Sequence, residues 1–298
     1  MNTKGRSLEL FFVNGKPDQM LTAEVFGWTG HVLMFPRTQL VEAFQRKETK
    51  FTGIYLLIGE NEQGPLAYVG EAEDVGSRIK NHDVNKDWWT SVVLITSAAN
   101  NLNKAHVKYL ESRMVEIAKS VGRMDLENGN TPSRPSLSES VTASMEVFLE
   151  HILLVLPALQ IDFLLSNARP TVSSEKMVPD RKVPIFEIIH AKFGIDAKAV
   201  LDNGEFVVQK DSIARGKWVG QASITSSYSK LCEQLIRQKI LVQEGEARRF
   251  TENYAFNSPS AAAAVIQGRS SNGPTNWKVR GSKKTYKEWE IEEMNKLN

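Results

Sequence analysis

The chain has 298 residues, of which 41% are hydrophobic and 24% are charged, a composition typical of a folded soluble protein with room for two cores. Its net charge of +2 is too small to indicate a nucleic-acid partner, so any phosphate-binding surface must come from local clustering of basic residues. The single cysteine, Cys232, excludes an intrachain disulfide, and with only five histidines in the chain it argues against a structural zinc site.

The sequence shows no pattern typical of a targeting or membrane segment. The N-terminus lacks the apolar core of a signal peptide, and the most apolar run, residues 147–165, is interrupted by charged residues and a proline. We therefore expect a cytoplasmic protein with no membrane span.

The first fifty residues are rich in strand patterns. Residues 7–13 form an apolar run that ends at an Asn-Gly turn, and residues 22–34 hold a second β-rich run. A short helix is expected over residues 38–45. We predict that residues 1–50 form a β-rich extension packed on, or hydrogen-bonded to, a domain that spans residues 51–165.

Two apolar segments around a polar turn predict a β-hairpin at the start of that domain. The first segment covers residues 53–58, and the second ends in Tyr68-Val69-Gly70 after a turn rich in Gly, Asn and Pro. Each predicted strand thus presents one phenol, Tyr55 or Tyr68, near a glycine.

Two helices are predicted after the hairpin. The first covers residues 71–82, has acids in its first turn, and carries Arg78 and His82 four positions apart, so that they share a face. The second covers residues 104–120 and places Glu111 beside its apolar stripe.

An apolar run between these helices, residues 87–95, predicts a buried central strand. Trp88 and Trp89 stand at its start. Packing against the core is the favoured interpretation for both, and the alternative is that one of them stacks on a nucleobase.

Together these segments supply two phenols, a guanidinium, an imidazole and a carboxylate, which suit the hydrolysis of a phosphodiester. The transition state gathers negative charge on the non-bridging oxygens, and a fixed arginine and a divalent cation stabilise that charge. A carboxylate binds a hard cation such as Mg²⁺, and a tyrosine or histidine can relay the proton of the attacking water. A single carboxylate indicates one metal ion rather than two.

The order and spacing of these residues resemble the GIY-YIG nuclease superfamily over roughly residues 51–130. The matching elements are Gly53-Ile54-Tyr55, Tyr68-Val69-Gly70 with valine in place of the usual isoleucine, Arg78, His82 and Glu111. The resemblance implies an α+β fold in which a small mixed sheet is flanked by helices. It also implies single-metal cleavage of nucleic acid, with DNA favoured over RNA.

The resemblance also implies a role for each residue. Glu111 binds Mg²⁺ or Mn²⁺, and Arg78 neutralises charge that develops on the phosphoryl oxygens. Tyr55, Tyr68 or His82 positions or deprotonates the attacking water. A free phenol has a pKa near 10, so a tyrosine base would need a neighbouring positive charge, whereas an imidazole is closer to the required range.

Four further residues are candidates for substrate binding: Gly70, Lys104, Lys108 and Asn130. The two lysines fall in one helical row with Glu111 and either approach a phosphate or form an ordinary solvated face. Nuclease cores of this superfamily end with an asparagine near the catalytic centre, and Asn128 or Asn130 fits that place. The alternative is that both asparagines support turns.

The composition changes between residues 166 and 183, which we predict to be a linker. Residues 184–298 then show hairpin signals, a helix over 226–239 and a helix that starts at Ser258-Pro259, and they predict a smaller α+β domain. The segment 256–277 resembles a C-terminal module often appended to these nucleases, a DUF4357-type domain without an assigned activity.

Two short stretches of this domain carry alternative interpretations. Gly268-Arg269 and Asn272-Gly273 either cradle a phosphate through backbone amides or form plain tight turns. The basic tail, residues 280–287, either touches a nucleic-acid backbone or is simply solvated.

These features predict a metal-dependent endonuclease that hydrolyses phosphodiester bonds in nucleic acid. One alternative is a nucleic-acid-binding or partner-docking module on the same scaffold that cleaves nothing. Another is that the C-terminal domain binds a protein or a small ligand and directs the nuclease. Repair intermediates, foreign duplex DNA, branched structures and RNA all suit the same residues, because catalytic side chains report the bond that is cut and not the sequence that is read.

Overall fold

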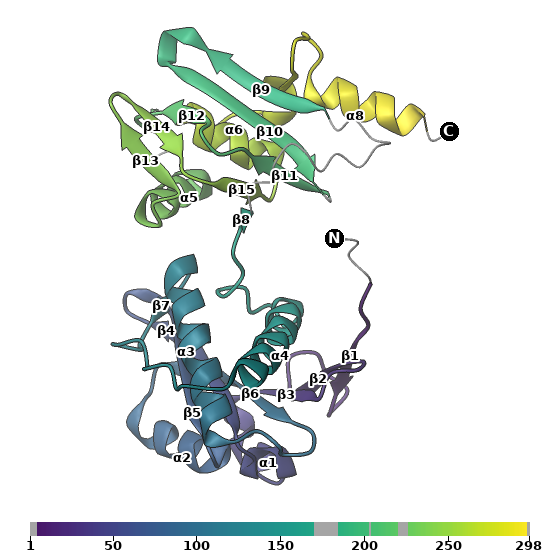
Figure 1. Cartoon of the computed structure of the whole chain (residues 1–298), viewed down its shortest axis with the longest axis vertical. Helices are drawn as coiled ribbons and strands as arrows, with labels where there is room; N and C mark the ends of the chain where they lie inside the picture. The colour runs from purple at the N-terminus through teal and green to yellow at the C-terminus, as the bar shows by residue number, and fades with distance from the viewer. Residues whose placement is uncertain (1–4, 170–183, 203, 220–225, 297–298) are drawn as a thin grey trace. The chain divides into compact units, whose positions relative to one another are not determined.

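The computed structural model describes residues 5–169, 184–202, 204–219 and 226–296. The chain folds into two compact units, Met1–Leu165 and Ser166–Asn298, each with its own sheet and helices (Figure 1). The predicted linker begins where the second unit begins, and residues 170–183 of it lie outside the described residues.

The first unit is built on a seven-stranded sheet. Its strands lie in the order β1 (Leu8–Phe12), β2 (Leu21–Val25), β3 (Gly30–Pro36), β6 (Trp89–Ser97), β4 (Gly53–Asn61), β5 (Gly64–Ala72) and β7 (Asp125–Leu126). All neighbours are antiparallel except β5 and β7, which are parallel. Because β3 pairs with β6 along its whole length, the first fifty residues extend the same sheet that carries the predicted hairpin.

Helices cover both faces of this sheet, and side chains at their N-termini explain where the three long ones begin. The helical segments are η1 (Arg37–Gln39), α1 (Leu40–Ala43), η2 (Lys47–Lys50), α2 (Val75–Asn85), α3 (Lys104–Val121) and α4 (Glu139–Ala158). Asp74, Asn103 and Ser138 each accept a hydrogen bond from a backbone amide of the first turn, which caps α2, α3 and α4. Helix α2 starts later than predicted, because residues 71 and 72 still belong to strand β5.

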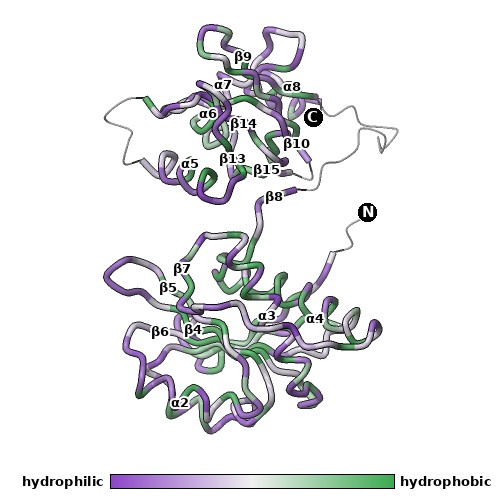
Figure 2. The backbone as a smooth tube through the Cα atoms, turned by 60° about the vertical axis from the view of Figure 1, so that its left-hand side comes forward, coloured by the Kyte–Doolittle hydropathy of each residue, from purple (hydrophilic) through white to green (hydrophobic). Residues whose placement is uncertain are grey.

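Alternation along the central strands divides the core of the first unit into two layers. Ile54 and Leu56 of β4 pack with α3 and α4, whereas Tyr55 and Leu57 point to the other face and pack with α1 and α2. Figure 2, in which the backbone is coloured by residue hydropathy, shows hydrophobic residues in green along these strands. The two tyrosines of the motif therefore belong to the face that α2 covers.

Helix α4 is, among the described residues, the single helix with the length and composition to cross a membrane. Met145, Phe148, Ile152 and Val155 recur at helical spacing along it, and all four are buried in the core of the first unit. A core helix of this kind passes the same test, so α4 is no evidence for a membrane span. Pro157, the predicted end of the helix, lies in its last turn.

The second unit is built on a nine-stranded sheet, which confirms the predicted mixed α+β class. The path is β13 (Leu241–Glu244), β14 (Ala247–Phe250), β12 (Ile213–Arg215), β10 (Ile195–Asp202), β11 (Glu205–Val208), β15 (Asn253–Phe256) and β8 (Ala168–Arg169), and β9 (Ile185–His190) joins β10 to β16 (Lys278–Val279). Its helical segments are η3 (Ala191–Phe193), α5 (Ser227–Arg237), α6 (Pro259–Gln267), α7 (Gly273–Asn276) and α8 (Tyr286–Asn295). The sequence did not predict β8, which falls in the expected linker, or α8, which begins within the basic tail.

Candidate active site

The β4–β5 hairpin brings the two predicted tyrosines to one face of the first sheet. Tyr55 lies opposite Gly70, and Leu57 lies opposite Tyr68, so both phenol rings project on the side that α2 covers. Their ring centroids are 6.0 Å apart. Tyr55 is fully buried and Tyr68 is half-buried, so Tyr68 is the phenol nearer to solvent.

Gly70 is a glycine because the two rings occupy the space that a side chain would need. A Cβ built there would lie 2.3 Å from the Cζ and Oη atoms of Tyr55 and 2.8 Å from the Cε1 atom of Tyr68. Real Cβ atoms essentially never come within 3.0 Å of another heavy atom. The predicted binding residue Gly70 therefore has a packing role, which is to let the tyrosines approach each other.

Helix α2 places Arg78 and His82 against the Tyr55 hydroxyl, as their shared face predicts. The Oη atom of Tyr55 lies 2.8 Å from Nε2 of His82 and accepts a hydrogen bond of 3.4 Å from Nε of Arg78. The imidazole also packs against Tyr68, with ring centroids 5.3 Å apart. The hydroxyl is thus held between a cation and an imidazole.

Burial and charge set the protonation states of this group. Burial, and then the positive charges of Arg78 and Lys86, lower the pKa of His82 to about 4, so its ring is neutral at pH 7. Burial, and then the neighbouring phenol Tyr68, raise the pKa of Tyr55 above its usual value, and Arg78 offsets this only in part. At neutral pH, Tyr55 is protonated and donates to the Nε2 atom of His82.

Glu111 of helix α3 lies in the electrostatic field of Arg78. Burial, and then the charge of Glu71, raise the pKa of Glu111 to about 7, while Lys104, Lys108 and Arg78 act to lower it. The structure therefore brings the predicted carboxylate and the predicted guanidinium to one site, although they are distant in the sequence.

Glu71 is a second carboxylate at this site that the sequence analysis did not single out. Its Oε2 atom lies 2.8 Å from Nζ of Lys104, so one of the two predicted lysines forms an ion pair with Glu71. Both Lys104 and Lys108 are exposed. Glu71, Arg78 and Lys104 line an open depression of about 370 Å³ with five other residues of the β5 end and α2. Glu71 comes directly after the Tyr-Val-Gly triplet, and this position in the sequence could have identified it as a candidate.

The carboxylates of Glu111 and Glu71 fit a hard divalent cation such as Mg²⁺ or Mn²⁺ better than zinc or copper, because they offer only oxygen ligands. The described residues contain no group of three or more His, Cys, Asp or Glu side chains arranged to hold a metal ion. An ion at Glu111 would therefore keep much of its water shell, as Mg²⁺ does in many sites. Since the pKa of Glu111 is raised to about 7, a cation bound there would displace a proton near neutral pH and favour the ionised carboxylate.

The two candidate asparagines lie in different environments. Asn128 is buried and pairs with the backbone of Val69 in both directions, because its Oδ1 accepts from the amide at 2.9 Å and its Nδ2 donates to the carbonyl at 2.7 Å. Asn130 is exposed. Asn128 thus supports the strand that carries Tyr68, and Asn130 lies on the surface.

Lys86 and Glu127 border the site beside Tyr68, and sequence reasoning missed both. The Lys86 ammonium lies 5.1 Å from the centroid of the Tyr68 ring and pairs with Glu127, which also accepts from Nε1 of Trp88 at 3.1 Å. Lys86 caps the C-terminus of α2, four positions after His82, a spacing that could have identified it. Trp89 is almost fully buried, as the core interpretation predicts, and Trp88 is half-buried.

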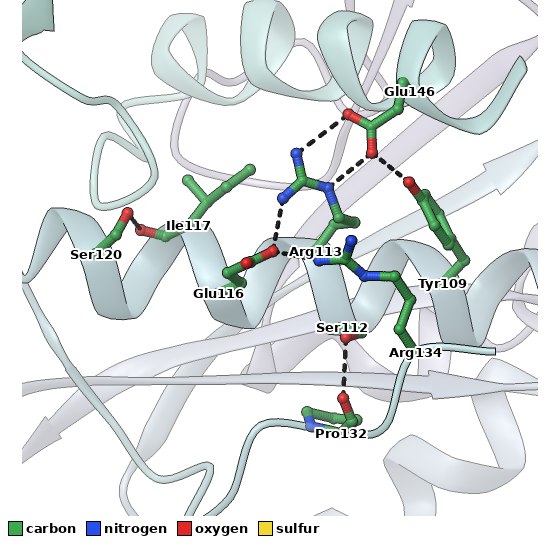
Figure 3. Close-up of polar contacts among 9 residues, drawn as sticks. All are labelled: Tyr109, Ser112, Arg113, Glu116, Ile117, Ser120, Pro132, Arg134 and Glu146. Carbon is green, nitrogen blue, oxygen red and sulfur yellow. Dashed lines mark hydrogen bonds and ion pairs between the residues drawn. The ribbon is translucent and has the colours of Figure 1, made fainter. Parts of the chain in front are cut away.

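A cluster of polar side chains fixes helix α3, and with it Glu111, against α4 (Figure 3). Glu146 accepts from Tyr109 at 2.6 Å and from Arg113 through two nitrogens at 2.7 and 3.2 Å. Glu116 accepts from Arg113 and from Arg134 of the following loop, each at 2.6 Å. The cluster ties the helix and the loop that follows it into one support for the carboxylate.

The glycine-containing turns of the second unit are engaged in its packing. Gly268 has a φ of +62° and caps α6, and a Cβ there would lie 2.6 Å from the carbonyl oxygen of Lys217. Gly273 packs against Pro259 and donates its amide to Ser260 at 3.2 Å. These contacts support the plain-turn interpretation over a phosphate cradle.

Comparison with curated proteins finds no match for this chain, and comparison with solved structures finds none either. One family match is found, and it lies wholly within the second unit. It confirms the prediction made from the pattern in residues 256–277. Residues 187–290 match the family described as Domain of unknown function (DUF4357).

Proposed function

We propose that residues 51–130 form a nuclease core of the GIY-YIG type and that the protein is a metal-dependent endonuclease acting on DNA. The observation that carries the proposal is the environment of a single atom. The Oη of Tyr55 contacts Arg78 and His82, and Arg78 in turn lies within electrostatic reach of Glu111. These residues come from three elements of the fold and meet only in the folded chain.

The arrangement suggests how the chain's own residues would take part in hydrolysis. Arg78 orients the scissile phosphate and compensates the negative charge that grows on its oxygens. Tyr55 takes a proton from the attacking water while its own proton passes to Nε2 of His82. The relay leaves no free tyrosinate, which burial disfavours, but it places the proton on His82, whose pKa burial also lowers. That proton returns through Tyr55 to the leaving oxygen as the bond between this oxygen and phosphorus breaks. Mg²⁺ or Mn²⁺ held by Glu111 would supply a Lewis acid at the phosphate.

Nicking of supercoiled plasmid tests the proposal. The full-length protein should produce nicked circles with Mg²⁺ and none with chelator, and Glu111→Gln and Arg78→Ala should each abolish nicking while the thermal unfolding transition remains. Glu150→Gln makes the same chemical change at an exposed position of α4 and should leave the rate unchanged. Metal-dependent nicking that survives both active-site substitutions would rule out the assignment.

The same experiment separates cleavage from binding alone. If the protein retains DNA on a filter but releases no product with any divalent cation, the scaffold is a binding or docking module. Nicked, flapped, branched and plain duplex substrates, and RNA, can then be compared in the same assay to identify the structure that is bound or cut.

A further inference from the structure

The two units carry opposite net charge, although the whole chain is nearly neutral. Residues 1–165 contain 16 Lys and Arg against 20 Asp and Glu, whereas residues 166–298 contain 21 against 15. A polyanion is therefore repelled by the average charge of the unit with the candidate active site and attracted by that of the other unit. The DUF4357 match covers most of this positive unit.

Within the positive unit, the turn between β9 and β10 presents an aromatic ring flanked by two cations. Phe193 is 42% exposed and forms the end of the short η3 segment. The guanidinium carbon of Arg215 lies 4.3 Å from the centroid of its ring, and the ammonium of Lys192 lies 5.7 Å from it. Arg215 reaches the turn because β12 pairs with β10 immediately beyond it.

The two cations beside Phe193 have no carboxylate partner among the described residues. In the described part of the chain, no carboxylate lies within 4 Å of the charged groups of Lys192 or Arg215. By contrast, Arg169 and Arg249 of the same unit are ion-paired to carboxylates. Ile189, 57% exposed, adds further apolar surface at the end of β9.

An exposed ring with two cations beside it has the chemistry that binds unpaired bases. Bases stack on aromatic rings and on guanidinium planes, and Lys and Arg contact the phosphates on either side. Base pairs in a duplex hide these faces, so the ring would add little to duplex binding. Phe193 is not among the residues of the buried core of the unit, so its ring is free of core packing.

We propose that Phe193, Lys192 and Arg215 form a binding surface for single-stranded nucleic acid, on which one base stacks while the two cations contact adjacent phosphates. The choice of nucleic acid as the partner rests on the proposed function. The location and the strand preference rest on the geometry of this turn. The DUF4357 unit then has a role of its own, which is to hold an unpaired strand.

Fluorescence anisotropy tests the surface in the full-length protein. Labelled oligothymidylate and oligouridylate of about twenty nucleotides are titrated with chelator present, so that cleavage plays no part in the signal. Phe193→Ala should weaken binding at least about fivefold, the lower range for loss of one base stack. Phe193→Trp keeps a ring and should bind at least as tightly as the natural protein. Because the ring lies outside the buried core, either change should shift the unfolding temperature by a few degrees at most.

A matched pair of charge variants locates the cations. Lys192→Ala with Arg215→Ala should weaken binding and reduce the slope of log affinity against log salt by about 1.4, which is two single-strand phosphate contacts. Lys230→Ala with Arg237→Ala removes the same two charges from the exposed side of α5 and should leave the slope nearly unchanged. A preference for DNA or RNA is read from the two oligonucleotides.

The outcomes separate this inference from the proposed nuclease function. If the α5 variant loses as much affinity as the Lys192 and Arg215 variant, or if Phe193→Ala weakens duplex and single strands equally, the proposed surface is wrong. If the natural protein nicks plasmid but shows no single-strand affinity, only the surface is refuted. If it binds single strands through Phe193 but cuts nothing, the surface stands and the nuclease function fails.

Discussion

Replacing Gly70 with alanine tests whether hairpin packing sets the geometry of the candidate active site. The added Cβ would lie 2.3 Å from the Cζ and Oη atoms of Tyr55 and 2.8 Å from Cε1 of Tyr68. The contact with Tyr55 cannot be relieved by a small movement of a flexible side chain, because the Tyr55 ring is fully buried and packed in the core. The ring must move by several tenths of an ångström, and its hydroxyl must move away from His82.

The expected cost follows from that displacement. Overpacking of a core by one methyl group destabilises a protein by about 1–3 kcal/mol, which for a unit of this size lowers the melting temperature by roughly 2–12 °C. A misplacement of about 1 Å in a catalytic group can slow a reaction on the order of a hundredfold. We therefore expect Gly70→Ala to unfold at a lower temperature and to nick plasmid at least about tenfold more slowly.

Calorimetry and plasmid nicking measure the two effects separately. Gly129→Ala is the matched control, because a Cβ there would meet nothing within 4 Å and its backbone is not in the left-handed region. Activity is compared well below both melting temperatures, so that unfolded protein does not contribute. A Gly70→Ala protein with the melting temperature and rate of the control would show that the rings shift freely and that this packing does not position Tyr55.

Three further predictions concern the supports of the site. The folded pKa of His82 is about 4, so as the pH falls below about 6.5 the imidazole is protonated in the unfolded chain before it is protonated in the folded one. The unfolding free energy should therefore drop by up to about 3 kcal/mol between pH 6.5 and 4. Urea titrations of His82→Gln should show a flatter dependence on pH. Asn128→Ala removes both bonds to the Val69 backbone and should cost about 1–3 kcal/mol by urea denaturation, whereas Asn130→Ala should cost almost nothing. Glu146→Gln should lower the unfolding free energy by about 1 kcal/mol at pH 7, because a half-exposed ion pair contributes no more than that. Arg113 holds the pKa of the Glu146 carboxyl below its ordinary value, so the contribution of the ion pair to stability should disappear as the pH falls through that lowered pKa. Melting curves recorded across pH measure this loss.

Local patterns in the sequence were sufficient to predict several helices and strands of this protein. The hairpin of Tyr55 and Tyr68 lies where two apolar segments around a polar turn predict it, and the helix that carries Glu111 lies where its apolar stripe predicts it. These features depend on residues a few positions apart, whose conformational preferences are the same before and after the chain folds. The shared face of Arg78 and His82 follows from the same short-range geometry.

Tertiary structure decided what those residues do to one another. Nothing in the sequence indicated that Glu71 would crowd Glu111, that Asn128 would be buried against β5, or that Gly70 is required by two rings. Each depends on contacts between segments separated by tens of residues, and the pKa values depend on how completely those contacts exclude water. Short-range preferences therefore determined which elements form, whereas burial and long-range packing determined which of their side chains meet and in which protonation state.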